Sequence, residues 1–210
     1  MKIVAVINYG CGNIPSIVNM LNYLGIESSV ITEPDEIGKY ESIILPGVGH
    51  FQHGMNMINN SGFRKALDKV ANEGCHILGI CLGMQLMTSR SEEASAGLGW
   101  FKCKTRKFSN LDQNNNKVLV PHMGWDTIKQ SSHSALFATD PKFYFVHSYY
   151  VDAVGTDEEL CTSRYGGVNF SSVIKKGNLM GVQFHPEKSH TYGMNFFREY
   201  FKSIGVVDAS

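Results

Sequence analysis

Hydrophobic positions in the first half of the chain alternate between short continuous runs and stretches with helical spacing. The runs at residues 3–7, 28–31 and 42–45 are typical of parallel strands that are covered on both faces. Helical spacing occurs at two sets of positions, namely Ile14, Ile17, Val18, Leu21 and Leu24 before Gly25, and Phe63, Ala66, Leu67 and Val70. Repeated β-α-β units of this kind predict an α/β fold with an open, doubly wound, mostly parallel sheet and flanking helices.

The second half of the chain has a different pattern. Residues 102–183 contain short apolar stretches interrupted by turn residues at 114–116, 166–167 and 177–178. Turn residues at such intervals favour hairpins, so we expect an antiparallel extension of the sheet. A closing helix is predicted after Ser189, and its apolar stripe comprises Tyr192, Phe196, Phe197 and Tyr200. We expect residues 1–210 to form one domain, because no linker, repeat or low-complexity segment divides them.

Composition and charge argue against several classes of function. The chain is 43% hydrophobic and 18% charged, which suits a globular protein rather than a disordered one. Its 19 basic and 19 acidic side chains give a formal net charge of +0, so neither a nucleic acid nor a membrane is expected as a partner. No apolar run approaches the roughly 20 residues of a membrane span, and the first residues are too short for a signal sequence. We therefore expect a cytoplasmic protein.

The five cysteines lack the spacing of a structural site. Their number is odd and no Cys-x-x-Cys pair occurs, so neither a disulfide framework nor a bound metal is expected. Cys75, Cys103 and Cys161 are interpreted as small, partly buried hydrophobic residues, and Cys11 as a packing residue. Cys81 differs from all four because of the residues around it.

Cys81 stands between a predicted strand at residues 76–80 and a predicted helix that begins at Leu82. Gly79 and Gly83 flank it, and a sharp strand-to-helix corner needs such small neighbours. The corner would lift the cysteine clear of the sheet, and the helix N-terminus would favour the thiolate and a developing oxyanion. This pattern predicts a nucleophile elbow with sulfur as the nucleophile.

A candidate base lies near the end of the chain, in the sequence Gly-Val-Gln-Phe-His-Pro-Glu. His185 and Glu187 are two residues apart on a segment that we expect to be extended, so their side chains would point to the same side. Pro186 favours extended geometry at His185. An isolated His-Pro-Glu could equally be a strand end with a solvated charge. Because a cysteine elbow is also present, the stronger interpretation is that His185 is a base and Glu187 is the carboxylate that orients it.

An oxyanion requires two hydrogen-bond donors. The backbone N–H of Leu82, directly after the nucleophile, is one candidate by elbow geometry. The second is expected from the sequence Pro46-Gly47-Val48-Gly49, at Val48 or Gly49, because glycine allows backbone orientations that are closed to other residues. Taken alone, this sequence is more simply a tight turn after a strand.

The glycine-rich segment at residues 8–13 suggests a dinucleotide site, but it lacks the full pattern. Pro15 occupies the position of the third glycine, and no Walker lysine follows. We interpret this segment as a turn and a helix cap, and we expect no cofactor.

Six motifs together resemble the class I (triad) glutamine amidotransferases. Two of them are GICLGMQ at residues 79–85 and GVQFHPEKS at residues 181–189. Four further segments resemble the glutaminase subunits of imidazole glycerol phosphate synthases within that family, at residues 46–51, 91–93, 121–125 and 144–149. The resemblance extends over the whole chain.

The resemblance implies that L-glutamine is hydrolysed through a thioester on Cys81, with His185 and Glu187 as the other members of the triad. It also implies which residues hold glutamine, namely Gly47, Gln85, Glu93, Ser148 and Tyr149. Gln85 follows Cys81 by one helical turn and can face the same pocket. Glu93 could equally be part of a solvated helix end. The resemblance further implies that the loop at 46–49 reorients before the oxyanion hole is complete.

The family also implies a partner, a (β/α)8-barrel cyclase subunit that receives ammonia in histidine synthesis. The residues matching its interface are Asn13, Trp125, Tyr144 and Lys188, although burial in the core is the usual fate of a tryptophan. One alternative is a paralogous glutaminase that serves amidino-sugar formation in surface polysaccharide synthesis. Another is a catalytically silent binding or regulatory module on the same fold.

Overall fold

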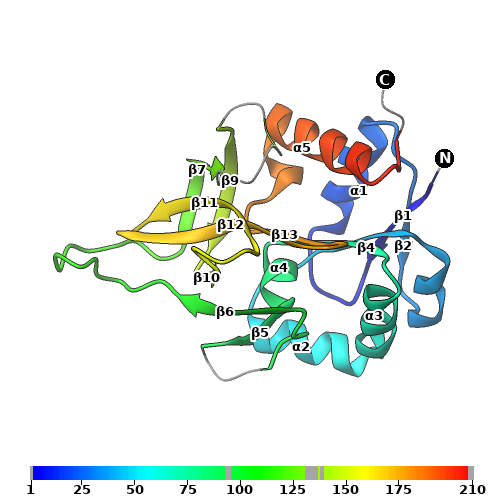
Figure 1. Ribbon diagram of the computed structural model, residues 1–210, viewed down its shortest axis with the longest axis horizontal. Coiled ribbons are helices and arrows are strands. Elements are labelled where there is room, and N and C mark those ends of the chain that lie inside the picture. Colours follow the sequence, from blue (N-terminus) through cyan, green and yellow to red (C-terminus); the bar gives the residue numbers. More distant parts are fainter. Residues whose placement is uncertain (1, 93–95, 131–136, 138–139, 208–210) are drawn as a thin grey trace.

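The computed structural model describes residues 2–92, 96–130, 137 and 140–207. Within them, an 11-stranded sheet has the order β2-β1-β3-β4-β13-β12-β10-β6-β5, with β11 beside β12 and β8 beside β11, and β7 and β9 form a separate ribbon (Figure 1). The strands are β1 (Val4–Ile7), β2 (Ser28–Ile31), β3 (Ser42–Leu45), β4 (His76–Ile80), β5 (Thr88–Ser91), β6 (Phe101–Lys107), β7 (His122–Thr127), β8 (Lys129–Gln130), β9 (Lys142–His147), β10 (Tyr149–Asp152), β11 (Glu159–Tyr165), β12 (Val168–Lys176) and β13 (Leu179–Val182). The α-helices are α1 (Ile14–Tyr23), α2 (Phe51–Asn60), α3 (Phe63–Asn72), α4 (Leu82–Leu86) and α5 (His190–Ser203).

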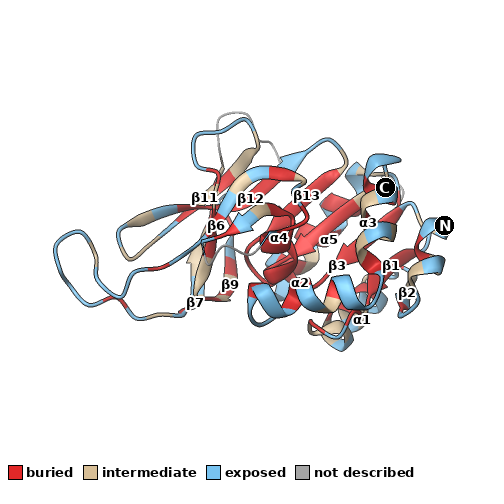
Figure 2. Ribbon diagram, turned by 90° about the horizontal axis from the view of Figure 1, so that it is seen from below, coloured by how far each residue is buried: buried red, intermediate tan, exposed pale blue. Residues whose placement is uncertain are grey.

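The first half of the sheet is parallel, as predicted. Strands β2, β1, β3, β4 and β13 pair in parallel, with helices on both faces (Figure 1). Because side chains alternate along a strand, Ala5 and Ile7 pack into the core beneath α2 and α3, whereas Val4 and Val6 pack into the core beneath α1 and α5. Burial on both faces explains the uninterrupted apolar run of β1, and Figure 2 shows these central strands as buried.

The antiparallel extension is also confirmed. Strand β12 pairs antiparallel with β13 and β11, and β10 pairs antiparallel with β12 and β6. The turn at 166–167 joins β11 to β12, and the turn at 177–178 joins β12 to β13. Each contains glycine with a positive φ, which a tight turn between antiparallel strands requires. Between β6 and β7 a long exposed loop projects from the body of the molecule (Figures 1 and 2).

Three local features differ from the sequence predictions. Helix α2 was not predicted, although Phe51, Met55 and Ile58 have helical spacing and are buried. The first strand begins at Val4 rather than one residue earlier. Tyr192 is 44% exposed, so it lies outside the buried stripe of α5, which includes Phe196, Phe197 and Tyr200.

The topology brings three separate segments of the chain to one edge of the sheet. Leu45 at the end of β3 is in register with Gly79 of β4, and Ile80 is in register with Val182 of β13. The segments that follow these strands therefore emerge side by side. Ligands of open α/β sheets bind beyond the carboxyl ends of the strands, so this edge is the place to look for a site.

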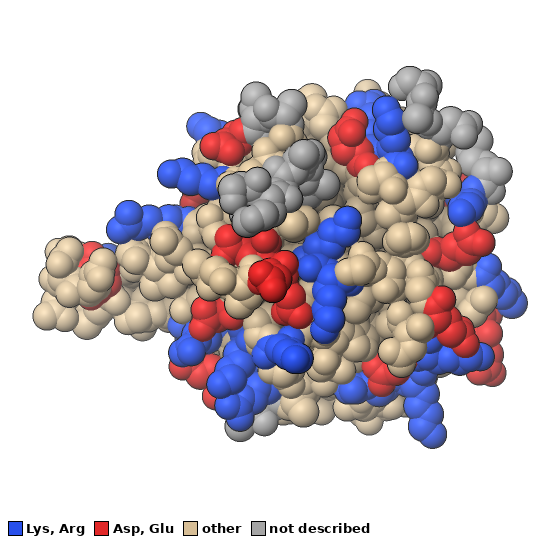
Figure 3. Space-filling model, in the orientation of Figure 1, with Lys and Arg blue, Asp and Glu red and all other residues tan. Residues whose placement is uncertain are grey.

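Charges are mixed on the face shown in Figure 3, where Lys and Arg are interspersed with Asp and Glu. Among the described residues, no helix has both the length and the apolar character needed to cross a bilayer.

Candidate active site

Cys81 occupies a strained corner between β4 and α4. Its φ is 53° and its ψ is −108°, values that L residues rarely adopt. A Cβ on Gly83 would lie 1.9 Å from the Leu45 carbonyl oxygen, and one on Gly79 would lie 2.5 Å from the Met87 sulfur. Both glycines are therefore required for the close approach of strand and helix. The predicted strand, sharp corner and helix are all present.

His185 and Glu187 form a direct pair just after β13. His185 Nδ1 lies 2.8 Å from Glu187 Oε1, and each side chain is only 1% exposed. The expected extended segment is wrong at Glu187, because residues 186–188 form a 3₁₀ turn after an extended His185. The turn still brings the carboxylate back to the imidazole. Glu187 Oε2 and His185 Nε2 have no hydrogen-bond partner among the described residues.

The environment of His185 favours its charged form. Burial alone would lower the pKa of this imidazole, but the Cys81 sulfur and the Glu187 carboxylate raise it, and the net result is a pKa of about 10. An imidazolium near neutral pH therefore stands beside the cysteine and is held by a carboxylate. This arrangement provides a proton donor next to a sulfur nucleophile.

Gln183 also contacts Cys81, although its position was not predicted from the sequence. Its Nε2 lies 3.7 Å from Cys81 Sγ, and its Oε1 accepts a hydrogen bond of 3.1 Å from Gln85 Nε2. Gln85 Nε2 also donates to the Tyr149 carbonyl at 2.8 Å. The signal in the sequence was its place two residues before His185, within the same motif.

The two segments expected to supply the oxyanion hole contact each other. The Leu82 N–H donates to the Gly47 carbonyl at 3.3 Å, so in this structure that donor is occupied. The loop is held by the Tyr9 hydroxyl, which donates to the Pro46 carbonyl at 2.7 Å. Gly49 has a φ of +108°, a conformation that glycine adopts readily.

A cavity of about 540 Å³ lies at the same edge of the sheet. It brings together most of the residues proposed from the sequence, namely Asn13, Val48, Gly49, Cys81, Leu82, Gln85, Ser148, Tyr149, His185 and Lys188. Gly47 and Glu187 do not line this cavity but contact Leu82 and His185, which do. Glu93 lies outside the described residues. Asn13 is the N-cap residue of α1 and caps it without a side-chain hydrogen bond.

Trp125 and Tyr144 lie on the β7–β9 ribbon outside the cavity lining. Trp125 is 46% exposed, so the default expectation of a buried core tryptophan is wrong. Its ring stacks on His190 with centroids 5.7 Å apart and meets the Tyr144 ring edge-on at 6.3 Å. The ribbon holds an aromatic group at the surface close to the cavity.

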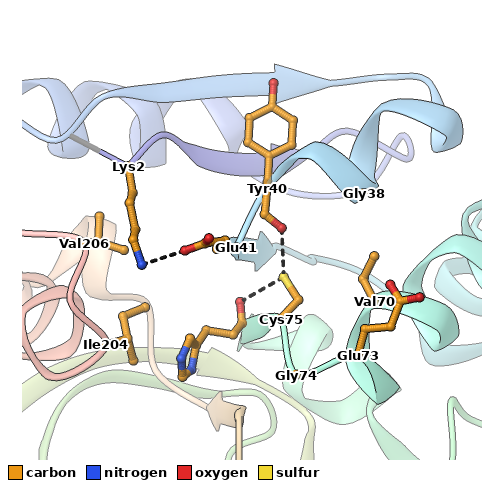
Figure 4. Close-up of a pocket in the computed structure, with 11 residues that line it drawn as sticks. Lys2, Gly38, Tyr40, Glu41, Val70, Glu73, Gly74, Cys75, Ile204 and Val206 are labelled. Atoms are coloured by element: carbon orange, nitrogen blue, oxygen red, sulfur yellow. Dashed lines mark hydrogen bonds and ion pairs between the residues drawn. The ribbon is translucent and has the colours of Figure 1, made fainter.

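The remaining cysteines are in different surroundings. Cys75 lines a second cavity of about 380 Å³ at the opposite edge of the sheet, where it donates to the Tyr40 carbonyl and lies near the Lys2–Glu41 ion pair (Figure 4). Burial and Glu41 raise the pKa of Cys75 to about 12, so this thiol is a poor nucleophile. Cys161 is fully buried, and Cys11 is 5% exposed. Among the described residues, no group of three or more His, Cys, Asp or Glu side chains could hold a metal ion.

Comparison with known proteins decides the family. A model of the family described as "Glutamine amidotransferase class-I" matches residues 5–203. The chain belongs to this family. It is 42% identical to "Imidazole glycerol phosphate synthase subunit HisH 2" of Methanococcus maripaludis, over 95% of this chain and 98% of that protein. It is 43% identical to subunit HisH of Bacillus licheniformis, over 96% of each chain.

Two solved structures share the fold. "Structure of PurLQS from Thermotoga maritima" matches 97% of this chain and 100% of that chain with a TM-score of 0.75 at 19% identity. "Crystal structure of glutamine amidotransferase" matches 97% of this chain and 99% of that chain with a TM-score of 0.73, also at 19% identity. The predicted fold class and the predicted family resemblance are both confirmed.

Proposed function

We propose that this chain is the glutaminase subunit of an imidazole glycerol phosphate synthase, active in histidine biosynthesis. Curated relatives with that name, 36–43% identical over nearly their whole length, support this role. The observation that carries the chemistry is Cys81, held on a strained elbow in a cavity beside the His185–Glu187 pair. Residues 1–210 would form one glutaminase domain, in the cytoplasm.

The reaction begins with the sulfur of Cys81 attacking the side-chain amide carbon of glutamine. Collapse of the tetrahedral intermediate breaks the C–N bond, and His185 gives its proton to the leaving ammonia. A water molecule then attacks the thioester while His185 removes a proton from it, which releases glutamate and restores the thiolate. Glu187 fixes the imidazole tautomer through Nδ1 and stabilises the charged ring.

The oxyanion is bound by the backbone N–H of Leu82 and by that of Val48 or Gly49. In the conformation described above, the Leu82 N–H is engaged by the Gly47 carbonyl. The loop at 46–49 must therefore turn before both donors can face the substrate. Such a requirement keeps hydrolysis slow until a partner stabilises the turned loop.

Glutamine is held by polar groups that line the cavity. Both N–H groups of the Gln85 amide are used by the Tyr149 carbonyl and Gln183 Oε1, so Gln85 offers its Oε1 to a ligand. A lone oxygen acceptor suits the α-ammonium group of glutamine. We assign Ser148, Tyr149 and Gly47 to the remaining polar groups of the substrate, and retain Glu93 as a candidate on the strength of the family resemblance.

Ammonia passes to a (β/α)8-barrel cyclase that docks beside the cavity. A strip of exposed apolar side chains supports docking at this point: Leu119, Pro121, Met123 and Trp125 are exposed, whereas His122 between them is buried. Interfaces are enriched in methionine and aromatic residues of this kind. Asn13, Tyr144 and Lys188 border the same region, and we assign them to the interface.

The test is to mix the chain with the histidine-pathway cyclase subunit of the same organism and measure glutamate release with and without its ribonucleotide substrate. Strong stimulation supports histidine synthesis. Absence of stimulation, with Cys81 still labelled by a glutamine-like electrophile, favours the polysaccharide paralogue. Absence of selective labelling favours a silent module. Glutamate release by a Cys81→Ala variant would contradict the mechanism itself.

A further inference from the structure

Two buried histidines at the cavity take no part in the proposed steps: His147 lines the cavity, and His122 does not line it but contacts His147. His122 of β7 and His147 of β9 are paired across the ribbon, and the His122 Nδ1 to His147 Nε2 distance is 3.1 Å. Aromatic rings enclose them: His122 is stacked between Phe145 at 5.1 Å and Tyr165 at 4.0 Å. Exposed fractions of 4% and 5% exclude both rings from solvent.

The hydrogen bonds define which nitrogen of each ring carries a proton. His147 Nδ1 lies 2.7 Å from the Tyr149 carbonyl, and a carbonyl only accepts, so Nδ1 is protonated. Burial lowers the pKa of His147 to about 3, so the ring is neutral and its Nε2 accepts. The proton of the bond between the rings therefore belongs to His122 Nδ1.

This assignment of protons shows that His122 and Asp126 do not form a second catalytic dyad. His122 Nε2 lies 3.4 Å from Asp126 Oδ2, which at first sight matches the His185–Glu187 arrangement. Burial lowers the pKa of His122, with Asp126 opposing, and a neutral His122 with its proton on Nδ1 has none to give Asp126. Asp126 therefore does not orient a base here, and the chain of bonds points in the other direction, toward Tyr149.

The Tyr149 carbonyl is the point at which this pair reaches the proposed glutamine site. It accepts one hydrogen bond from His147 Nδ1 and another from Gln85 Nε2. Gln85 in turn donates to Gln183, which reaches the Cys81 sulfur. The donor of each hydrogen bond in this series is known. The orientation of the Gln85 amide therefore follows from that of the Tyr149 peptide.

We propose that His122 and His147 are positioning residues of the glutamine site. They hold the Tyr149 carbonyl in one orientation, and through it they keep the Gln85 oxygen turned toward the substrate's α-ammonium group. The proposal rests on the proposed glutaminase function. Its consequence is that losing the pair weakens recognition of glutamine without changing the reactivity of the Cys81 sulfur.

The experiment compares two reagents at Cys81 on the full-length chain. The diazoketone 6-diazo-5-oxo-L-norleucine requires the glutamine site, whereas iodoacetamide requires only a reactive sulfur. The variants are His147→Phe, the double variant His122→Phe/His147→Phe, and His147→Asn, whose amide can still donate to the Tyr149 carbonyl. The double variant removes both polar partners inside an aromatic surrounding, so neither is left unpaired. His76→Phe, at the opposite edge of the sheet, is the matched control.

We expect labelling by the diazoketone to slow at least tenfold in His147→Phe and in the double variant, while labelling by iodoacetamide stays within twofold. His147→Asn should recover diazoketone labelling to within threefold, and His76→Phe should behave as the parent chain. Unchanged diazoketone labelling in the double variant overturns the proposal. Equal slowing with both reagents also overturns it, because the pair would then be merely structural. A parent chain that iodoacetamide labels at Cys81 and the diazoketone does not would overturn the proposed function itself.

Discussion

The Leu82 N–H donates to the Gly47 carbonyl, so the amide expected to bind an oxyanion is already occupied by the loop that should complete the site. A buried hydroxyl reinforces this state, since Tyr9 anchors the loop through the Pro46 carbonyl at 2.7 Å. Under the proposed mechanism, this conformation opposes hydrolysis until a partner turns the loop. Weakening the anchor should relax this control.

Tyr9→Phe removes the anchor without adding volume. Loss of one such hydrogen bond weakens the resting loop by about 1 kcal/mol. Glutamate release without a partner should rise about fivefold, as that free energy predicts. Tyr200→Phe is the matched control, because its buried hydroxyl has no hydrogen-bond partner among the described residues. A fall in the partner-independent rate of Tyr9→Phe would contradict this account of the loop.

The charged form of His185 should stabilise the folded protein in a defined pH range. Burial opposes the charge, but Cys81 and Glu187 raise the folded-state pKa to about 10, above the 6.5 of an ordinary histidine. The contribution is therefore fully present below about pH 6.5 and is lost as the pH rises through about 10. The melting temperature of the parent chain should exceed that of His185→Gln most at pH 6, and the gap should shrink by pH 10. A gap that widens with pH would contradict the assignment.

Glu187→Gln should leave binding intact and impair the chemical steps. The amide retains the size of the carboxylate but no longer stabilises the imidazolium at 2.8 Å. By analogy with other triads, kcat should fall by about 10²–10⁴-fold with little change in KM for glutamine. Steady-state glutamate release measures both. Glu158→Gln, which alters a carboxylate near Lys176, should change neither.

The five cysteines should differ sharply in reactivity toward iodoacetamide. Burial raises the pKa of Cys75 and of Cys103 to about 12. Glu41 adds to this shift at Cys75, and Glu158 adds to it at Cys103. Neither thiol supplies much thiolate at pH 7.5. Peptide mass spectrometry after brief reaction should find the label at Cys81 first, and a Cys81→Ser variant should be almost unlabelled. Comparable labelling of Cys75 in the folded chain would refute this ranking.

Trp125→Ala should affect docking rather than catalysis. The ring is 46% exposed and fixed by stacking on His190, which makes it a rigid anchor for a partner. Removing a central aromatic anchor typically costs about 2 kcal/mol or more, so the cyclase concentration needed for half-maximal stimulation should rise at least tenfold. Labelling of Cys81 without the partner should not change. Tyr23→Ala, which removes an exposed ring at the far end of α1, is the control.

Much of the fold follows from local sequence pattern. Continuous apolar runs predicted the central parallel strands, because residues buried on both faces leave no polar alternation. Glycines at 79 and 83 predicted the corner at Cys81, because any larger residue there would collide with neighbouring backbone or side chains. Helix α2 was not predicted even though its apolar spacing was present. Its buried stripe is narrow, and most of its other residues are polar, so the helical pattern is weak.

The sequence by itself determined β1 to β4, the elbow and the spacing of His185 and Glu187, because these depend on residues only a few positions apart. Tertiary structure decided that Gln183 meets Cys81, 102 positions away, and that Gln85 meets Tyr149, 64 positions away. It also decided that Gly47 occupies the Leu82 N–H and that Trp125 is exposed. Such contacts depend on the order in which strands enter the sheet, and no local periodicity encodes that order.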